Sequence, residues 1–326
     1  MPNLVSGIFK VQPLLVTADV TLSQLATLME QSPPRLESFT PGWGGPDDSL
    51  HFLGRTATEP AVTKPVIVRS FRDYPDTLLS RLYWYESDPR AKYYVDGDLT
   101  LEQRRALHAC DVLIAPDGLG GWTVLVTTRT KATLNRFVLP ALRSVFSSAD
   151  GASLLQADTS RLALGNADFF LWLVYRSMGD PSLSEHVRVE RVHQVNTQTA
   201  GTLHGAVFRY GIDPDRHDVN ATLASNRAVL GPAKLLLRDD ELGLTVDFEL
   251  FEDGGFGIKT SETSYDDEAL DADLRLNAVL DLAFHVTPTL RNFYESEEDW
   301  MAVKRDAFRA ARWQRLIDGQ QAELAD

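Results

Sequence analysis

The stretch AKLLLRDDELGLTVDFELF, residues 233–251, decides the fold class of this chain. Its second half alternates apolar with polar residues, which is the period of a half-buried strand, and its first half is a leucine-rich run of strand length. The turn EDGG at 252–255 then leads into a short apolar segment at 256–260. Together these segments predict consecutive strands of an antiparallel sheet.

The sequence on either side of this hairpin predicts further strands and several helices. Other strands are expected at 6–16, 50–55, 66–71, 110–115, 122–127, 187–196 and 203–210. Helices are expected at 22–29, 76–86, 131–146, 165–178, 268–294 and 296–321. Thr21 is expected to cap the first helix, and Pro140 and Pro288 to kink or split the helices that contain them.

This order of elements predicts an α+β fold, with antiparallel sheets and packed helices, rather than a doubly wound parallel sheet. Three segments are expected: an N-terminal α+β unit at 1–147, a C-terminal α+β unit at 148–295, and a closing helix at 296–326. Hydrophobic residues make up 44% of the 326 residues, which is enough for packed cores.

Composition also limits the cellular compartments in which the protein is expected. The sequence has no apolar run of membrane-spanning length and no basic start followed by an apolar stretch, so we expect neither a membrane partner nor a signal peptide. Cys110 is the single cysteine, which fits a reducing compartment. We therefore expect a cytoplasmic protein, or one bound to the nucleoid of a bacterium.

The net charge of −14 argues against a uniformly basic nucleic-acid binder. A local basic surface is still compatible with this net charge. Screening at physiological salt limits the range of a charge to about 8 Å, so distant acidic residues do not cancel a basic cluster.

No complete catalytic, metal or cofactor pattern is present. The glycine-rich run at 118–121 lies between two predicted strands and predicts a turn, because a phosphate loop needs a helix after it. Cys110 lies in an apolar strand and is expected to be a core residue. His186, His193, His204 and His217 lack the spacing of metal ligands. We expect no cofactor and no bound metal.

One alternative is a divergent metal-dependent nuclease. Such enzymes place an Asp and then Glu-x-Lys on a hairpin, where the carboxylates hold the metal. The sequence offers a loose imitation of this pattern in Asp247, Glu249, Asp253 and Lys259. The Glu-x-Lys spacing is absent, because Gly257 stands where its glutamate belongs. The competing interpretation is a plain hairpin with solvated acids.

Basic residues are interleaved with aromatic residues in the first half of the chain. Cations bind phosphates, and aromatic rings stack on bases or sugars. The rings are Phe71, Tyr74, Tyr83, Trp84, Tyr85, Tyr93 and Tyr94. The candidate nucleic-acid-binding cations are Arg81, Arg90 and Lys92 among these rings, followed by Arg129, Lys131 and Arg136. The alternative is a core of aromatic residues with solvated arginines.

The closing helix has two distinct sides. Arg305, Arg309 and Arg312 share one side and are added to the candidate nucleic-acid contacts. Ala310, Trp313 and Ile317 share another side, which needs the body of the protein or a second chain as a partner. The alternative for the basic side is packing with salt bridges to the acidic surface.

The order of several segments resembles a known family. In the first half these are the Gly42-Trp43 loop and the strand at 122–127, which is followed by the helix at 131–143. In the second half they are Trp172, RSMG at 176–179, strands at 207–210 and 244–251, and DAD at 271–273. In this order they resemble RdgC, the recombination-associated protein family of bacteria. The resemblance covers about two thirds of the chain by order of elements.

The resemblance implies a ring-shaped homodimer that encircles double-stranded DNA without sequence preference and restrains the recombinase filament. An acidic exterior around a basic hole would reconcile this function with the negative net charge. The family carries no catalytic residues. The first hypothesis is therefore a non-enzymatic, dimeric DNA-binding protein.

A second hypothesis is an interaction subunit of a multi-protein complex in phage defence or genome maintenance. It would dock through the aromatic-rich middle or through the final helix. The divergent nuclease is the third.

Overall fold

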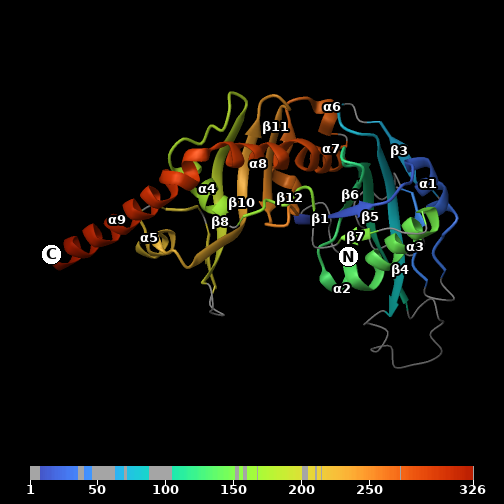
Figure 1. Cartoon of the computed structure of the whole chain (residues 1–326), viewed down its shortest axis with the longest axis horizontal. Coiled ribbons are helices and arrows are strands. Elements are labelled where there is room, and N and C mark those ends of the chain that lie inside the picture. Colours follow the sequence, from blue (N-terminus) through green and yellow to red (C-terminus); the bar gives the residue numbers. More distant parts are fainter. Residues whose placement is uncertain are drawn as a thin grey trace. The chain divides into compact units, whose positions relative to one another are not determined.

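The chain folds as the α+β protein that the sequence predicts, with helices packed on antiparallel strands (Figure 1). The computed structural model describes residues 8–35, 40–45, 63–69, 72–87, 105–150, 154–156, 160–166, 168–199, 205–209, 211–213, 215–271 and 273–325. The strand expected at 50–55 lies outside these residues. Two units are present, Met1–Arg161 and Leu162–Asp326, and the closing helix belongs to the second.

The first unit is built on an antiparallel sheet. Its strands run in the order β2 (Gly42–Gly44), β4 (Thr77–Ser87), β5 (Arg105–Pro116), β6 (Trp122–Val126) and β1 (Ile8–Thr17). Strand β3 (Val66–Val68) pairs with β4, and β7 (Leu154–Gln156) pairs with β1. The predicted hairpin of β5 and β6 is therefore confirmed.

The glycine-rich run between β5 and β6 is a turn, as predicted. The carboxylate of Asp117 accepts hydrogen bonds from the backbone N–H of Leu119 at 2.8 Å and of Gly121 at 2.7 Å. Gly118 and Gly120 have φ angles of 75° and 85°, which glycine adopts without a Cβ clash.

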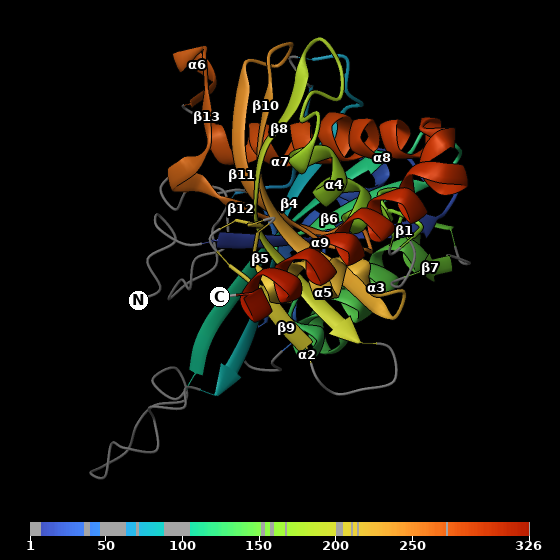
Figure 2. The same cartoon turned by 90° about the vertical axis from the view of Figure 1, so that its left-hand side faces the viewer.

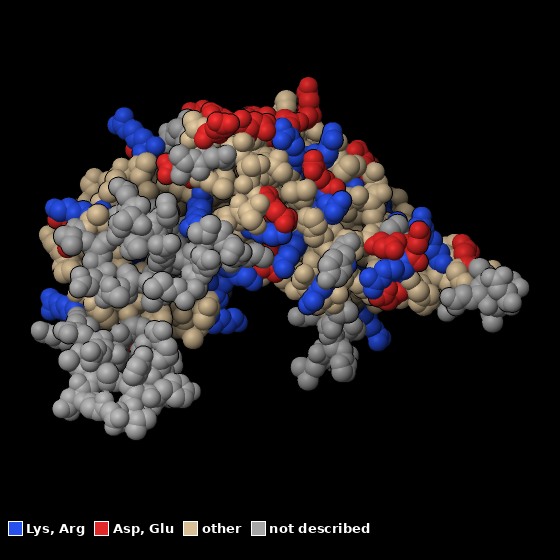
Figure 3. All heavy atoms as spheres, turned by 180° about the vertical axis from the view of Figure 1, so that it is seen from behind, with Lys and Arg blue, Asp and Glu red and all other residues tan. Residues whose placement is uncertain are grey.

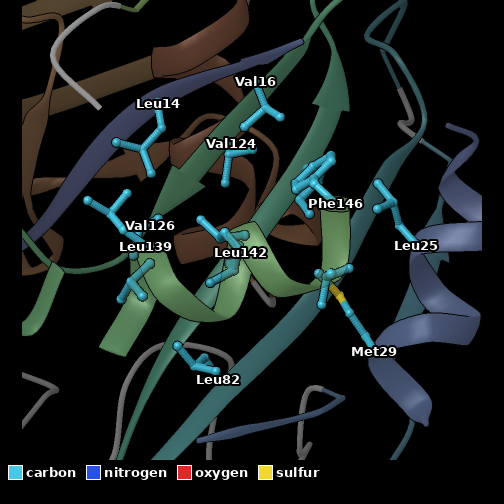
Figure 4. Packing of buried hydrophobic residues seen from close by; sticks show 14 of the residues in the cluster. Leu14, Val16, Leu25, Met29, Leu82, Val124, Val126, Leu139, Leu142 and Phe146 are labelled. Atoms are coloured by element: carbon cyan, nitrogen blue, oxygen red, sulfur yellow. The ribbon is translucent and has the colours of Figure 1, made fainter. Parts of the chain in front are cut away.

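Two helices cover this sheet. Helix α1 (Leu22–Glu30) begins with the predicted cap at Thr21, whose hydroxyl accepts from the N–H of Gln24. The second helix is continuous through α2 (Lys131–Thr133), the π-helical turn η3 (Leu134–Val138) and α3 (Leu139–Asp150). Figure 4 shows the core between helices and sheet, formed by Leu14, Val16, Leu25, Met29, Leu82, Val124, Val126, Leu139, Leu142 and Phe146.

The helix predicted at 76–86 is wrong, because this segment is strand β4. Every residue from Thr77 to Tyr85 is buried, so the segment has no exposed face whose spacing would distinguish the two structures. A buried apolar run of this length is compatible with either a helix or a strand. Pairing with β5 from Leu78 to Ser87 shows that the segment is a strand.

The second unit contains the sheet that the opening stretch predicts. Its strands run in the order β12 (Phe256–Lys259), β11 (Leu244–Leu250), β10 (Ala228–Asp239), β8 (Val187–Thr199) and β9 (Gly205–Phe208). Strand β13 (Ser264–Tyr265) pairs with β11 and follows the short 3-10 turn η4 (Thr260–Glu262). The predicted pairing of 233–238 with 244–251 is confirmed.

Helices cover one face of the second sheet. Helix α4 (Asp168–Met178) packs on β8 and β10, and α7 (Leu274–Asp281), the π-helical turn η5 (Leu282–Val286) and α8 (Thr287–Ser296) follow one another across the strands (Figure 2). The short α6 (Glu268–Asp271) precedes them. The closing helix comprises the π-helical turn η6 (Trp300–Lys304) and α9 (Arg305–Ala325), and α9 packs on α5 (His217–Ala224).

Two prolines follow π-helical turns instead of splitting their helices. Pro140 comes two residues after η3, and Pro288 comes two residues after η5. A π-helical turn shifts the hydrogen-bond register, and so a missing proline N–H disturbs the helix less. At both prolines, where a kink or split is expected, the helix instead changes locally from α-helical to π-helical hydrogen bonding.

Candidate nucleic-acid interface

Arg81 is buried, so the prediction that it contacts nucleic acid is wrong. Its Nε donates to Oδ1 of Asp111 at 2.6 Å, and its Nη2 donates to Oδ2 at 3.4 Å. Both side chains are 0% exposed, and the two residues are cross-strand partners on β4 and β5. Strand pairing therefore holds Arg81 against the carboxylate of Asp111 inside the sheet, away from solvent.

The aromatic residues beside this ion pair also belong to the interior. Tyr83, Trp84 and Tyr85 are 0%, 5% and 9% exposed. They pack in the core and are not available to stack on bases. The predicted Arg90 and Lys92 lie outside the described residues.

A cationic helix face runs along the continuous helix from Lys131 to Asp150. We define it by the exposed residues Lys131, Ala132, Asn135, Arg136, Pro140, Arg143, Ser144, Ser147 and Ser148. The opposite side is buried against the sheet. The predicted cations Lys131 and Arg136 therefore share one exposed face, while Arg129 is half-buried just before the helix.

The cationic helix face carries no acidic residue. The sequence has no Asp or Glu between Asp117 and Asp150, although the whole chain has 46 acidic and 32 basic residues. Lys131 and Arg143 form no ion pair with any residue that the structure describes. Positive charge is thus concentrated on the cationic helix face, although the net charge of the whole chain is −14.

Arg136 is held in place by a ring and a carboxylate. Its guanidinium carbon lies 4.9 Å from the centroid of the Phe137 ring. Its Nη1 lies 3.5 Å from Oε1 of Glu86, and the arginine side chain remains 72% exposed. An ion pair this exposed is weak, so Arg136 can exchange the carboxylate for another anion.

The predicted arginines of the closing helix face the body of the second unit. Arg305 Nη1 lies 2.8 Å from Oδ2 of Asp168, and Arg309 Nη2 lies 3.6 Å from Oδ1 of the same residue. Arg312 is half-buried, with its guanidinium carbon 4.7 Å from the Phe308 ring centroid. The salt-bridge interpretation therefore describes Arg305 and Arg309, and these arginines do not form an open phosphate-binding face.

The apolar side of the same helix is exposed. Val303 and Trp313 are 64% and 60% exposed, and Ala310 between them is also exposed. Phe308 and Leu316, on the side toward the body, are buried. Ala310 and Trp313 therefore do not pack on the described part of the second unit, which contacts the other side of the helix, whereas Ile317, expected on the same apolar side, is half-buried.

A second group of cations, not singled out from the sequence, lies on the second sheet. Arg188 and Arg191 of β8, Lys234 of β10 and Arg209 after β9 lie on the face opposite the buried valines and leucines. None of these four forms an ion pair with a described residue. We call this face the polar sheet face. The valine alternation at 187–196 could have identified it, since two of the alternating polar residues are arginines.

Acidic residues share the polar sheet face. Asp247 and Glu249 of β11 are the cross-strand partners of Leu236 and Lys234 on β10, so they point to the same side as these two residues. Figure 3 likewise shows Lys and Arg side chains interspersed with Asp and Glu on the face that it draws. The polar sheet face is therefore mixed in charge, unlike the cationic helix face.

Asp247 has an unusual environment on this face. Its side chain is 9% exposed, and its Oδ2 lies 3.6 Å from Nε2 of His193 and 4.0 Å from Nζ of Lys259. Burial, together with a hydrogen bond to Glu262, raises the pKa of Asp247 to about 6. Lys259 pairs with Glu262, and this contact holds the pKa of Glu262 below its ordinary value.

The described residues do not form the metal site that a nuclease needs. No group of three or more His, Cys, Asp or Glu side chains among them could hold a metal ion. Asp247 and Lys259 do lie near each other, but as cross-strand neighbours on a sheet rather than as part of a ligand cluster.

Cys110 has the environment of a core residue. Its side chain is 2% exposed within β5, and burial raises the pKa of the thiol. A buried, protonated thiol is a poor nucleophile, which agrees with the structural interpretation.

Comparison with known proteins adds no family assignment, since no protein-family model and no curated protein matches the chain. Within the described part of the chain, no helix has both the length and the apolar character needed to cross a membrane.

Proposed function

We propose that the protein binds double-stranded DNA without sequence preference and without catalysing a reaction, through phosphate contacts from the cationic helix face. The observation that carries this proposal is the exposed set Lys131, Arg136 and Arg143 on a helix with no acidic residue between Asp117 and Asp150.

The helix geometry suits a phosphate backbone. Lys131 and Arg143 are separated by about 18 Å along the helix axis, at about 1.5 Å per residue. Phosphates of one DNA strand recur about every 3.4 Å along the duplex axis, so the face spans several of them. The remaining exposed residues are small or polar and can approach a backbone closely. Contacts of this kind position a protein on DNA without reading bases.

The polar sheet face supplies additional cations for the same function. The polar sheet face has four cations that form no ion pair with a described residue, although the charge of Lys234 acts on Asp247: Arg188, Arg191, Arg209 and Lys234. The resemblance to RdgC supports the same proposal and adds a homodimer and a nucleoid location to it. In that arrangement acidic residues outside the two cationic faces would cover the exterior of the assembly, while Asp247 and Glu249 remain on the polar sheet face.

Fluorescence anisotropy with a labelled random-sequence duplex at low salt tests the proposal. The double variant Lys131→Glu/Arg143→Glu should weaken binding at least tenfold. The control Arg35→Glu/Lys64→Glu makes the same charge change elsewhere in the first unit and should change the affinity much less. Absence of binding by the native protein at low salt, or equally weakened binding in both variants, would refute the proposal.

The exposed apolar side of α9 favours the second candidate function, an interaction subunit of a larger complex. Trp313 is large, apolar and 60% exposed, which is typical of residues that anchor a protein partner. Affinity purification from the native host, comparing the native chain with Trp313→Glu, tests this candidate. A partner retained equally by both forms would argue against docking through α9.

A further inference from the structure

The polar sheet face has a charge balance that one proton can change. Arg191, Leu236 and Asp247 lie in one row across β8, β10 and β11, because Leu236 is the cross-strand partner of both other residues. The carboxyl group of Asp247 therefore lies one strand away from Lys234, whose charge acts on it, and two strands away from Arg191 on the same face. When it is ionised it offsets part of their charge.

Asp247 is surrounded by titratable and charged groups from each neighbouring element. His193 belongs to β8, Lys234 to β10, Lys259 to β12 and Glu262 to η4. Lys259 is already engaged with Glu262, so its positive charge is shared between two carboxyl groups. Glu262 can accept a hydrogen bond from protonated Asp247, which leaves one negative charge where two would otherwise repel each other.

We propose that Asp247 is a proton-operated regulator of the polar sheet face, in which proton uptake by its carboxyl group strengthens the binding of nucleic-acid phosphate and proton release weakens it. This inference rests on the proposed DNA-binding function and adds a regulatory group to it.

The direction follows from charge alone. Above a pH of about 6, Asp247 is ionised and lowers the positive potential around Arg191 and Lys234. Below that pH its carboxyl group is neutral, and the face gains one unit of positive charge. Burial and the neighbouring Arg191 lower the pKa of His193 from its ordinary value. Protonation of His193 would also add positive charge to this face, so the variant His193→Gln is needed to separate its titration from that of Asp247.

The regulation is tested by duplex binding at low salt between pH 5.5 and pH 7.5. We expect the native protein to bind roughly three- to tenfold more tightly at the lower pH, the effect of one screened charge close to the ligand. Asp247→Asn, which is neutral at every pH, should bind at pH 7.5 about as tightly as the native protein at pH 5.5. His193→Gln should keep the native dependence on pH. Asp318→Asn on α9 removes one charge away from the face and should also keep it.

The outcomes separate the regulation from the function. Binding with the same pH dependence in native protein and in Asp247→Asn overturns the regulation alone. A carbon NMR titration that places the pKa of Asp247 near its ordinary value overturns it as well. No binding by any form at pH 5.5 and low salt overturns both the DNA-binding function and the regulation that depends on it.

Discussion

The guanidinium of Arg81 and the carboxylate of Asp111 form a fully buried ion pair between neighbouring strands, with Nε and Oδ1 2.6 Å apart. The backbone N–H of Asp111 also donates to the hydroxyl of Thr127, so the pair is tied to the end of β6. The pair places two charges inside the first sheet, where each depends on the other.

Removing one member of this pair should be strongly destabilising. Asp111→Ala leaves a buried guanidinium without its carboxylate, which costs about 3–5 kcal/mol in the free energy of unfolding. Replacing both residues, as in Arg81→Met/Asp111→Leu, removes both charges and should cost much less than Asp111→Ala. Urea denaturation of the variants measures the difference. If the double variant is as unstable as the single one, the buried charge is not the cause.

DNA binding should depend steeply on salt. Each cation that neutralises a phosphate releases a counterion and adds about 0.9 to the steepness of log affinity against log salt. Lys131→Gln/Arg143→Gln should therefore make this dependence shallower by about 1.8 if both side chains bind phosphate. The control Arg35→Gln/Lys64→Gln should leave the slope unchanged. An equally shallow slope in the control would mean that the helix face has no special role.

The pair formed by His285 and Asp239 should make stability depend on pH. His285 Nε2 lies 3.1 Å from Oδ2 of Asp239, a residue that is 0% exposed, and this contact raises the pKa of His285. A histidine with a raised pKa in the folded state stabilises the fold fully below its unfolded pKa of about 6.5. That stabilisation is lost as the pH rises through the folded pKa.

The native protein should therefore lose stability relative to His285→Gln as the pH rises from below the ordinary histidine pKa of about 6.5 through the raised pKa of His285 in the folded state. Denaturant titrations of both forms across this range measure the difference, and the same comparison cancels the titration of Asp247. A difference that does not change with pH would mean that His285 has the same pKa in the folded and unfolded protein, so that the contact with Asp239 does not raise it.

Truncation of the two tryptophans in the closing segment should have very different effects on the free energy of unfolding. Trp300 is 0% exposed and packs against Tyr175 at a centroid distance of 5.0 Å, whereas Trp313 is 60% exposed. Trp300→Ala should cost about 3–5 kcal/mol in the free energy of unfolding, and Trp313→Ala should change it by less than about 0.5 kcal/mol. Thermal or urea unfolding measures both. A large cost for Trp313→Ala would mean that this side chain is packed in the isolated protein.

Local sequence patterns alone predict the elements for which only one secondary structure fits. Alternation at 244–251 can bury one face only as a strand, and Thr21 followed by Gln24 forms a capping box at the start of a helix. The α+β class follows from the order of such elements. The absence of acidic residues around Lys131 is also a property of the sequence alone, although only the structure placed Lys131, Arg136 and Arg143 on one exposed face.

Tertiary structure decided the features that depend on which surfaces meet. Periodicity shows that Arg305 and Arg309 share a side of their helix, but only packing shows that this side faces Asp168 while Trp313 faces outward. Arg81 looks like a surface cation in the sequence, and only strand pairing places Asp111 opposite it. Burial and ion pairing arise between segments far apart in the chain, and so no local pattern of residues identifies the partner.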